Sequence, residues 1–360
     1  MPDRKPDVTR FLTALRREEP DCVPLSEFLM DQPVKEAFLG RHVGNSLLGV
    51  DDYDVAADVE FWAAAGYDYI HLAPWYLHLF PEGWHVTQGD YSRYSETPID
   101  KAWMEEHQGV LRTREDVARY PWPDPSQAQF EHIHQALSLL PEGMGLTSGT
   151  WGILETSRQL MGFEGMAYAL HDDPGLVEAV VDRVGTFLFE VFRKAAALPG
   201  VSALWLADDI AHADGFFFSP AFYRRVLFPW FRKYGEVAAS HGQPLIYHND
   251  GKFWEVIPDL VECGISALQP IEPKAMDIVE VKRQWGKHLA LIGNIDLGRT
   301  LTLGTPEDVE AEVKQRIREL APGGGYCVGS SNSIATYVPL ENYRAMLAAT
   351  MRWGKYPIHA

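Results

Sequence analysis

Three adjacent residues near the middle of the chain, His248, Asn249 and Asp250, have the types and spacing that acid–base chemistry or metal binding would need. They follow the apolar run 244–247 and precede Gly251. If this run is a buried strand, the imidazole and the carboxylate point to the same side, because side chains alternate along a strand. Such groups are costly to bury unless they bind or react with something. We therefore place a functional site at the end of this predicted strand.

Short apolar runs of this kind alternate with amphipathic segments of helical length along the whole chain. The predicted strands are residues 23–27, 67–72, 144–148, 203–207, 244–247, 267–270, 289–293 and 326–329. Continuous apolar runs suit parallel strands that are covered on both faces. Helices are predicted to begin after Asp173, Ser219 and Thr305, each followed by proline. The alternation predicts an α/β fold, a (β/α)8 TIM barrel formed by residues 1–360 as one domain, with an open doubly wound sheet as the alternative.

In such a barrel the chemistry lies at the carboxyl ends of the strands, which makes the polar residues there the candidates for a site. We predict that His248, Asp250 and Glu272 are catalytic. The predicted substrate-binding residues are Glu27, His71, Trp151, Glu155, Asp208, Asp209, Asn294, Ser331 and Asn332.

These candidates also have structural alternatives. His248 could be a core histidine bonded to a carbonyl group, and Asp250 could cap the next helix. Asp208 and Asp209 could form a turn and an N-cap. The two asparagines could satisfy backbone groups of loops, as asparagine often does. The cluster argues for function more strongly than any one member, because a single positional rule selects all of them.

Two loops after predicted strands are rich in aromatic residues. The loop after the second strand is long, and long loops are often lids, although a packed surface loop is the alternative. The aromatic residues are Trp75, Tyr76, Phe80, Trp84, Tyr91 and Tyr94 in that loop, and Phe216, Phe217 and Phe218 after the fourth strand.

Composition excludes several classes of protein. The net charge of -18 argues against binding to nucleic acid or to an anionic membrane face. No stretch of about 18 apolar residues predicts a membrane span. The three cysteines are widely spaced, which is typical of a reduced protein, and the first residues lack the apolar core of a signal peptide. We expect a cytoplasmic protein whose partner is a small-molecule substrate.

Several motifs resemble the uroporphyrinogen decarboxylase superfamily. They read HNDG at 248–251, LQPIEP at 268–273, LIGNID at 291–296, GTPEDV at 304–309 and GSSNSI at 329–334. The resemblance runs from about residue 145 to the end and is weaker before that. It implies a (β/α)8 barrel, often a homodimer, and a superfamily that holds both true decarboxylases and corrinoid-linked methyltransferases.

The sequence departs from both branches of the superfamily. The decarboxylases grip their substrate's carboxylates with an arginine-rich loop after the first strand, whereas residues 26–31 here read SEFLMD. The thiol-methylating branch binds zinc with a His-x-Cys pair and a later cysteine. In the chain described here Asp250 stands at the first cysteine and Asn332 near the second. Without these cysteines, the resemblance leaves His248, Asp250 and Glu272 as the predicted ligands of a divalent metal such as zinc. The metal would meet nitrogen and oxygen donors, and a thiol acceptor is disfavoured.

The leading hypothesis is a corrinoid (cobalamin)-linked methyltransferase that acts on a small O- or N-methylated compound. The corrinoid would be free or carried on a partner protein. In this hypothesis Trp151 and the aromatic loop exclude water around a methyl group. The alternatives are a decarboxylase of a uroporphyrinogen-like or smaller carboxylic acid, and a small-molecule-binding barrel without turnover.

Overall fold

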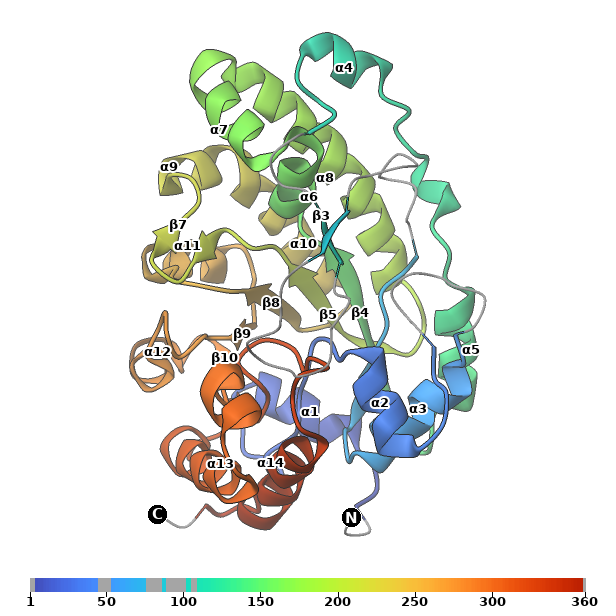
Figure 1. Cartoon of the computed structure of the whole chain (residues 1–360), viewed down its shortest axis with the longest axis vertical. Helices are drawn as coiled ribbons and strands as arrows, with labels where there is room; N and C mark the ends of the chain where they lie inside the picture. Colours follow the sequence, from blue (N-terminus) through green and yellow to red (C-terminus); the bar gives the residue numbers. More distant parts are fainter. Residues whose placement is uncertain (1–3, 45–52, 76–85, 89–101, 105–108, 359–360) are drawn as a thin grey trace.

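The computed structural model describes residues 4–44, 53–75, 86–88, 102–104 and 109–358. A curled sheet of parallel strands lies in the middle of the molecule, with helices outside it (Figure 1). In spatial order its strands are β1 (Tyr69–His71), β4 (Gly145–Trp151), β5 (Val201–Ala207), β8 (Leu245–Asn249), β9 (Ala267–Pro270), β10 (Ala290–Ile292) and β11 (Tyr326–Cys327). Neighbours in space follow one another along the chain, so the sheet has the connectivity of a (β/α) barrel.

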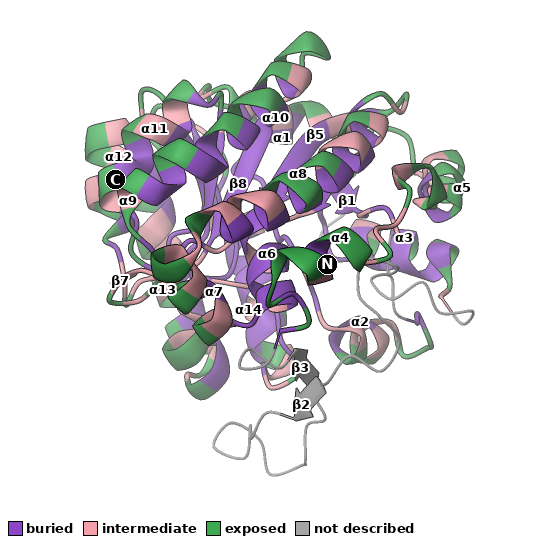
Figure 2. Cartoon of the chain, turned by 90° about the horizontal axis from the view of Figure 1, so that it is seen from above, coloured by how far each residue is buried: buried purple, intermediate pink, exposed green. Residues whose placement is uncertain are grey.

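Helices connect and cover these strands. They are α1 (Val8–Leu15), α2 (Gln32–Leu39), α3 (Val55–Ala64), α4 (Arg114–Arg119), α5 (Glu131–Leu139), α6 (Ile153–Met161), α7 (Phe163–Asp172), α8 (Pro174–Ala196), α9 (Pro220–Phe222), α10 (Phe228–Ser240), α11 (Ile257–Glu262), α12 (Ile278–Trp285), α13 (Pro306–Leu320) and α14 (Leu340–Trp353). The strands and the inward faces of the helices are buried, and the outward helix faces are exposed (Figure 2).

The predicted helix starts are confirmed. Asp173, Ser219 and Thr305 each accept a hydrogen bond from a backbone N–H of the helix that follows. At Thr305 the bond is reciprocal, because the Asp308 carboxylate accepts from the Thr305 N–H in a capping box. Proline at the next position loses nothing, since its missing N–H would have no partner in the first turn.

The interior of the curled sheet is filled by side chains from alternate strand positions. Ala203, Trp205 and Ala207 of β5 all point inward, as the two-residue period of a strand requires. Phe11 and Leu15 of α1 belong to the same buried cluster, so α1 packs against the inside of the sheet. The interior is therefore a packed core and not a channel.

The prediction of an eighth strand at residues 23–27 is wrong in the described structure. The segment makes only an isolated parallel bridge, between Leu25 and Val328. Around it, the Ser26 N–H donates to the Val328 carbonyl and the Val328 N–H to the Pro24 carbonyl, at 2.8 and 2.9 Å. Pro24 has no N–H to add to a ladder, which limits the pairing. The fold is thus TIM-barrel-like, with a seam at residues 23–27 that no continuous ladder closes.

Two short antiparallel pairs lie outside the main sheet. They are β2 (Val86–Gln88) with β3 (Ala102–Met104), and β6 (Ala211–His212) with β7 (Gly215–Phe216). Within the described ranges, no helix has the length and apolar character that crossing a membrane requires.

Candidate active site

His248 lies at the end of β8, where it is directly opposite Gln269 of β9. Its Nδ1 is hydrogen-bonded to the Gln269 Oε1, and the Gln269 Nε2 donates to the Asn332 carbonyl over 3.0 Å. Because a carbonyl only accepts, the amide nitrogen of Gln269 must face Asn332 and its oxygen must face His248. The proton of the imidazole is therefore on Nδ1. The lone pair of Nε2 is left available as a base or a metal ligand.

Asp250 faces that nitrogen. Its Oδ1 lies 4.0 Å from the His248 Nε2 and is shielded from solvent, without a hydrogen-bond partner among the described residues. The other oxygen, Oδ2, accepts from the Asn332 side-chain amide. Burial raises the pKa of Asp250 well above its usual value, and the nearby carboxylates of Asp209 and Glu272 raise it further. A buried oxygen of this kind beside a free imidazole nitrogen is a place where a cation or a substrate proton would be stabilised.

The metal-ligand set predicted from the sequence differs from the one that the geometry brings together. One donor atom each from Asp209, His248 and Asp250 lies within 4.8 Å of the others. Asp209 is held there because its Oδ1 accepts the Asp250 N–H at 2.8 Å. Glu272 lies beside this group, but its oxygens accept from the Gly251 N–H and pair with Lys274, both at 3.0 Å. Nitrogen and oxygen donors with open positions fit a divalent metal ion, which these three residues would hold.

Phe28 is a member of the site that sequence reasoning missed. Its ring stacks on the His248 imidazole with 4.8 Å between centroids, and it lies 5.1 Å from His71 and from Trp205. Trp151 contacts its edge at 6.1 Å. A search for polar residues passes over a phenylalanine. The available signal was its position directly after Glu27, at the end of the first predicted strand.

His71 lies at the end of β1 and also contacts Phe28. Its Nδ1 is 3.0 Å from the Thr147 hydroxyl. Burial, together with the positive charge of Lys35, lowers the pKa of His71 to about 3. The imidazole is therefore neutral at any physiological pH. It lines a pocket of about 80 Å³ whose walls include Phe28, Met30, Lys35 and Trp62.

The carboxylates of Asp208 and Glu27 accept hydrogen bonds from buried groups of neighbouring segments. Asp208 is fully buried and accepts the N–H groups of Leu154 and Glu155 at 3.0 and 2.9 Å, at the start of α6. Burial raises its pKa to about 7, although these two bonds oppose the shift. Glu27 is also fully buried and accepts the Ser330 N–H and hydroxyl at 2.6 and 2.8 Å. Burial raises its pKa to about 8 against these bonds.

The remaining candidates contact loop backbone. The Asn294 amide donates to the Ile271 carbonyl at 2.7 Å, and its buried oxygen has no hydrogen-bond partner in the part of the chain that the structure describes. The Ser331 hydroxyl accepts the Leu297 N–H at 2.9 Å. The Asn332 carbonyl accepts from Gln269, the partner of His248, and the Asn332 side chain donates to Asp250. Glu155 contributes its backbone N–H to Asp208.

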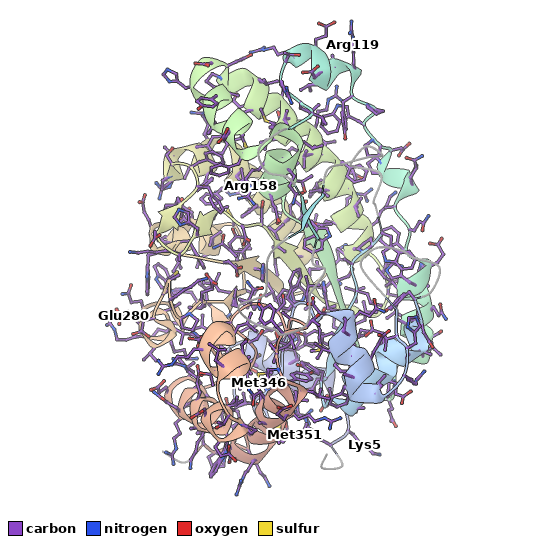
Figure 3. The ribbon with its side chains drawn as sticks, viewed as in Figure 1. Lys5, Arg119, Arg158, Glu280, Met346 and Met351 are labelled. Atoms are coloured by element: carbon purple, nitrogen blue, oxygen red, sulfur yellow. The ribbon has the colours of Figure 1, made fainter. Side chains whose placement is uncertain are left out.

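Most of the first aromatic loop lies outside the described residues, whereas the second lies within them. In the first, residues 76–85 and 89–101 lie outside the described residues. Trp75, at its start, stacks on His132 with 3.8 Å between ring centroids. In the second, Phe217 packs on the guanidinium of Arg158, which projects from α6 with its Cζ 4.6 Å from the ring centroid (Figure 3).

The chain was compared with known protein families. A family model described as uroporphyrinogen decarboxylase (URO-D) matches residues 106–353, more than half of the chain. The chain belongs to the uroporphyrinogen decarboxylase family. This member carries the match across β4 to β11, the strands that supply His248, Asp250 and Asp209.

The relatives of this family member include a methyltransferase and a decarboxylase. A methylated-thiol–coenzyme M methyltransferase of Methanosarcina mazei is 28% identical over 53% of the chain and 48% of its own length. A uroporphyrinogen decarboxylase of Actinobacillus pleuropneumoniae is 20% identical over 68% of the chain and 70% of its own length. The chain therefore spans about half the length of the methyltransferase that it matches.

The fold is shared with a solved methyltransferase from Methanosarcina mazei. That structure superposes with a TM-score of 0.67 at 19% sequence identity, covering 96% of the chain and 98% of the other. At this identity the likeness establishes the fold of this family member and nothing about its substrate.

Proposed function

We propose that this family member is a methyltransferase of the corrinoid-linked type that acts on a small O- or N-methylated compound. The observation that carries the proposal is the pair formed by the His248 Nε2 and the Asp250 Oδ1. These two atoms are 4.0 Å apart, and no other described residue competes for the oxygen. Homology to a methylated-thiol–coenzyme M methyltransferase supports the methyl-transfer part of the proposal.

The roles of the residues follow from their positions. The His248 Nε2 accepts or returns a proton at the heteroatom that loses or gains the methyl group, a step worth roughly 10²–10⁴-fold. Asp250 stabilises the positive charge that the imidazole then carries. Gln269 keeps the imidazole in the required tautomer, and Phe28 covers its face. When a divalent metal is bound, Asp209, His248 and Asp250 would hold it, and its Lewis acidity at the heteroatom would replace proton transfer to the His248 Nε2.

A corrinoid would supply the cobalt that exchanges the methyl group. The pocket beside His71, about 80 Å³, is too small for a corrinoid ring. We therefore propose that the corrinoid approaches from outside this pocket, either free or on a partner protein. Decarboxylation is the less favoured reaction, because a cluster of Asp209, Asp250 and Glu272 would repel a substrate with several carboxylates.

A spectroscopic titration tests the proposal. The purified protein is mixed with methylcobalamin, and separately with cob(I)alamin and a panel of methylated aromatics and amines. The expected result is a methyl-transfer change in the corrinoid spectrum that is lost in His248→Ala and kept in His241→Ala, a control on the exposed end of α10. Equal transfer by His248→Ala would contradict the role of His248. Release of carbon dioxide from an added carboxylic acid would favour the decarboxylase.

A further inference from the structure

The pocket beside His71 combines apolar walls with polar side chains, which include those of Asp31 and Gln32. Phe28, Met30 and Trp62 form the apolar part, and His71 and Lys35 contribute nitrogen. Phe28 contacts both His71 and His248, so the pocket adjoins the proposed catalytic group across one ring. None of the roles assigned above to His248, Asp250 or Asp209 uses this pocket.

The tautomer of His71 is fixed by its neighbours. The Trp205 Nε1 donates to the Thr147 Oγ1 at 3.2 Å, and an indole nitrogen can only donate. The Thr147 hydroxyl keeps its own hydrogen, and the His71 Nδ1 at 3.0 Å is its acceptor among the described residues. The proton of the neutral imidazole is therefore on Nε2. His71 offers an N–H donor to a ligand and no acceptor.

Lys35 gives the pocket a second donor. Its ammonium is buried and donates to both oxygens of Asp58, at 2.8 and 3.0 Å, while the Tyr53 hydroxyl also donates to Asp58. An ammonium has three donors, and in the described part of the chain two of them are used. The carboxylate of Asp31, which also lines the pocket, accepts the Thr336 N–H and hydroxyl at 2.9 and 3.0 Å.

Hydrogen-bond donors such as the His71 Nε2–H favour ligand atoms that accept hydrogen bonds. We propose that this pocket binds the oxygen-bearing edge of an O-methylated compound, with the His71 Nε2–H donating to an ether, phenol or carbonyl oxygen. The proposal rests on the proposed function and narrows its substrate class. A methylated ammonium has no lone pair that could accept the His71 N–H. A small aryl ether has both the oxygen and the apolar body that Phe28 and Trp62 would contact.

Matched ligands test this without turnover. Calorimetry compares methoxybenzene with ethylbenzene, which replaces only the ether oxygen by CH₂, and with phenyltrimethylammonium. The wild-type protein should bind the methoxy compound about tenfold tighter than the ethyl compound. His71→Leu should abolish that ratio, His71→Gln should keep part of it through its amide N–H, and the surface variant His241→Leu should leave it unchanged. Thermal melts confirm that each variant is folded.

Two results would overturn the proposal. One is equal or tighter binding of the trimethylammonio compound, or binding of none of the three. The other is a ¹⁵N spectrum in which the His71 imidazole carries its proton on Nδ1 or titrates between pH 5 and 8. The corrinoid titration gives an independent answer. Binding of the methoxy compound without methyl transfer removes the proposed function and leaves this pocket standing. Methyl transfer only from methylated amines would support the proposed function and would overturn the proposed role of this pocket.

Discussion

Asp208 and Asp209 are adjacent in the chain, but they hold different parts of the molecule. Asp208 accepts two N–H groups at the start of α6, whereas Asp209 accepts the N–H of Asp250 and lies within reach of the His248 imidazole. Both residues lie just past the end of β5, and their carboxylates have different partners. One carboxylate anchors a helix and the other belongs to the candidate site.

This division predicts opposite effects of two neighbouring substitutions. Asp208→Ala leaves two buried N–H groups without an acceptor and should lower the free energy of unfolding by about 2–4 kcal/mol. Asp209→Asn keeps an acceptor oxygen for the Asp250 N–H, so it should change stability little while reducing methyl transfer. Urea unfolding and the corrinoid assay measure the two effects. Loss of stability in Asp209→Asn comparable to that in Asp208→Ala would contradict the division.

Gln269 is predicted to act through the tautomer of His248. Gln269→Leu removes the acceptor for the Nδ1–H, and we expect activity to fall roughly 10–100-fold, as for other residues that orient a catalytic imidazole. The ¹⁵N shifts of His248 should then report a mixture of tautomers, which a purely structural role would not produce. Gln284→Leu, on the exposed face of α12, is the matched control. An unchanged His248 spectrum in Gln269→Leu would refute the assignment.

The geometry predicts which carboxylates matter for a metal. Zn²⁺ or Mn²⁺ binding, measured by calorimetry, should weaken more than about tenfold in Asp250→Asn and in Asp209→Asn, because each removes a charged ligand. Glu272→Gln should weaken it less, since Glu272 is already paired with Lys274. A chelator should lower the melting temperature of the metal-loaded protein and not that of Asp250→Asn. A larger loss in Glu272→Gln than in Asp209→Asn would restore the ligand set expected from the sequence.

Glu27 should make stability depend on pH. Its pKa is about 8 in the folded protein and ordinarily about 4.5, so between these values the folded state holds the proton more tightly than the unfolded state. Its contribution to the free energy of unfolding is full below pH 4.5. It is lost as the pH rises through 8, by about 1.4 kcal/mol for each pH unit between the two pKa values. Glu27→Gln keeps the contacts to Ser330 without a charge. The difference in melting temperature between Glu27→Gln and wild type should therefore grow from pH 5 to pH 9, and a constant difference would count against burial as the cause.

Sequence patterns predicted much of the fold because parallel strands that are buried on both faces consist of consecutive apolar residues. Seven of the predicted runs are strands of the main sheet, with ends shifted by a few residues. The run at 23–27 fails because apolar character does not reveal how many backbone N–H groups find partners, and Pro24 offers none. The positional rule likewise selected His248 and Asp250, because His248 is the next-to-last residue of β8 and Asp250 follows its final residue.

The rest of the site depends on contacts that no local pattern encodes. Ile271 has a left-handed backbone with φ of 55°, so the chain turns just before Glu272 and the two-residue alternation no longer predicts where that side chain points. Asp208 and Asp209 both follow Ala207, and only the packing of α6 decides which of them is covered. Phe28 and Lys35 enter the site from segments outside the main sheet.

Asn332 contacts the two sides of the site with different parts of itself. Its main-chain carbonyl receives the Gln269 amide that orients His248, and its side chain donates to Asp250. Every amino acid supplies the same carbonyl, so a replacement at position 332 can alter only the second contact. A replacement without an amide would therefore remove a hydrogen bond that lowers the pKa of Asp250, while the main-chain acceptor that orients the imidazole through Gln269 stays in place.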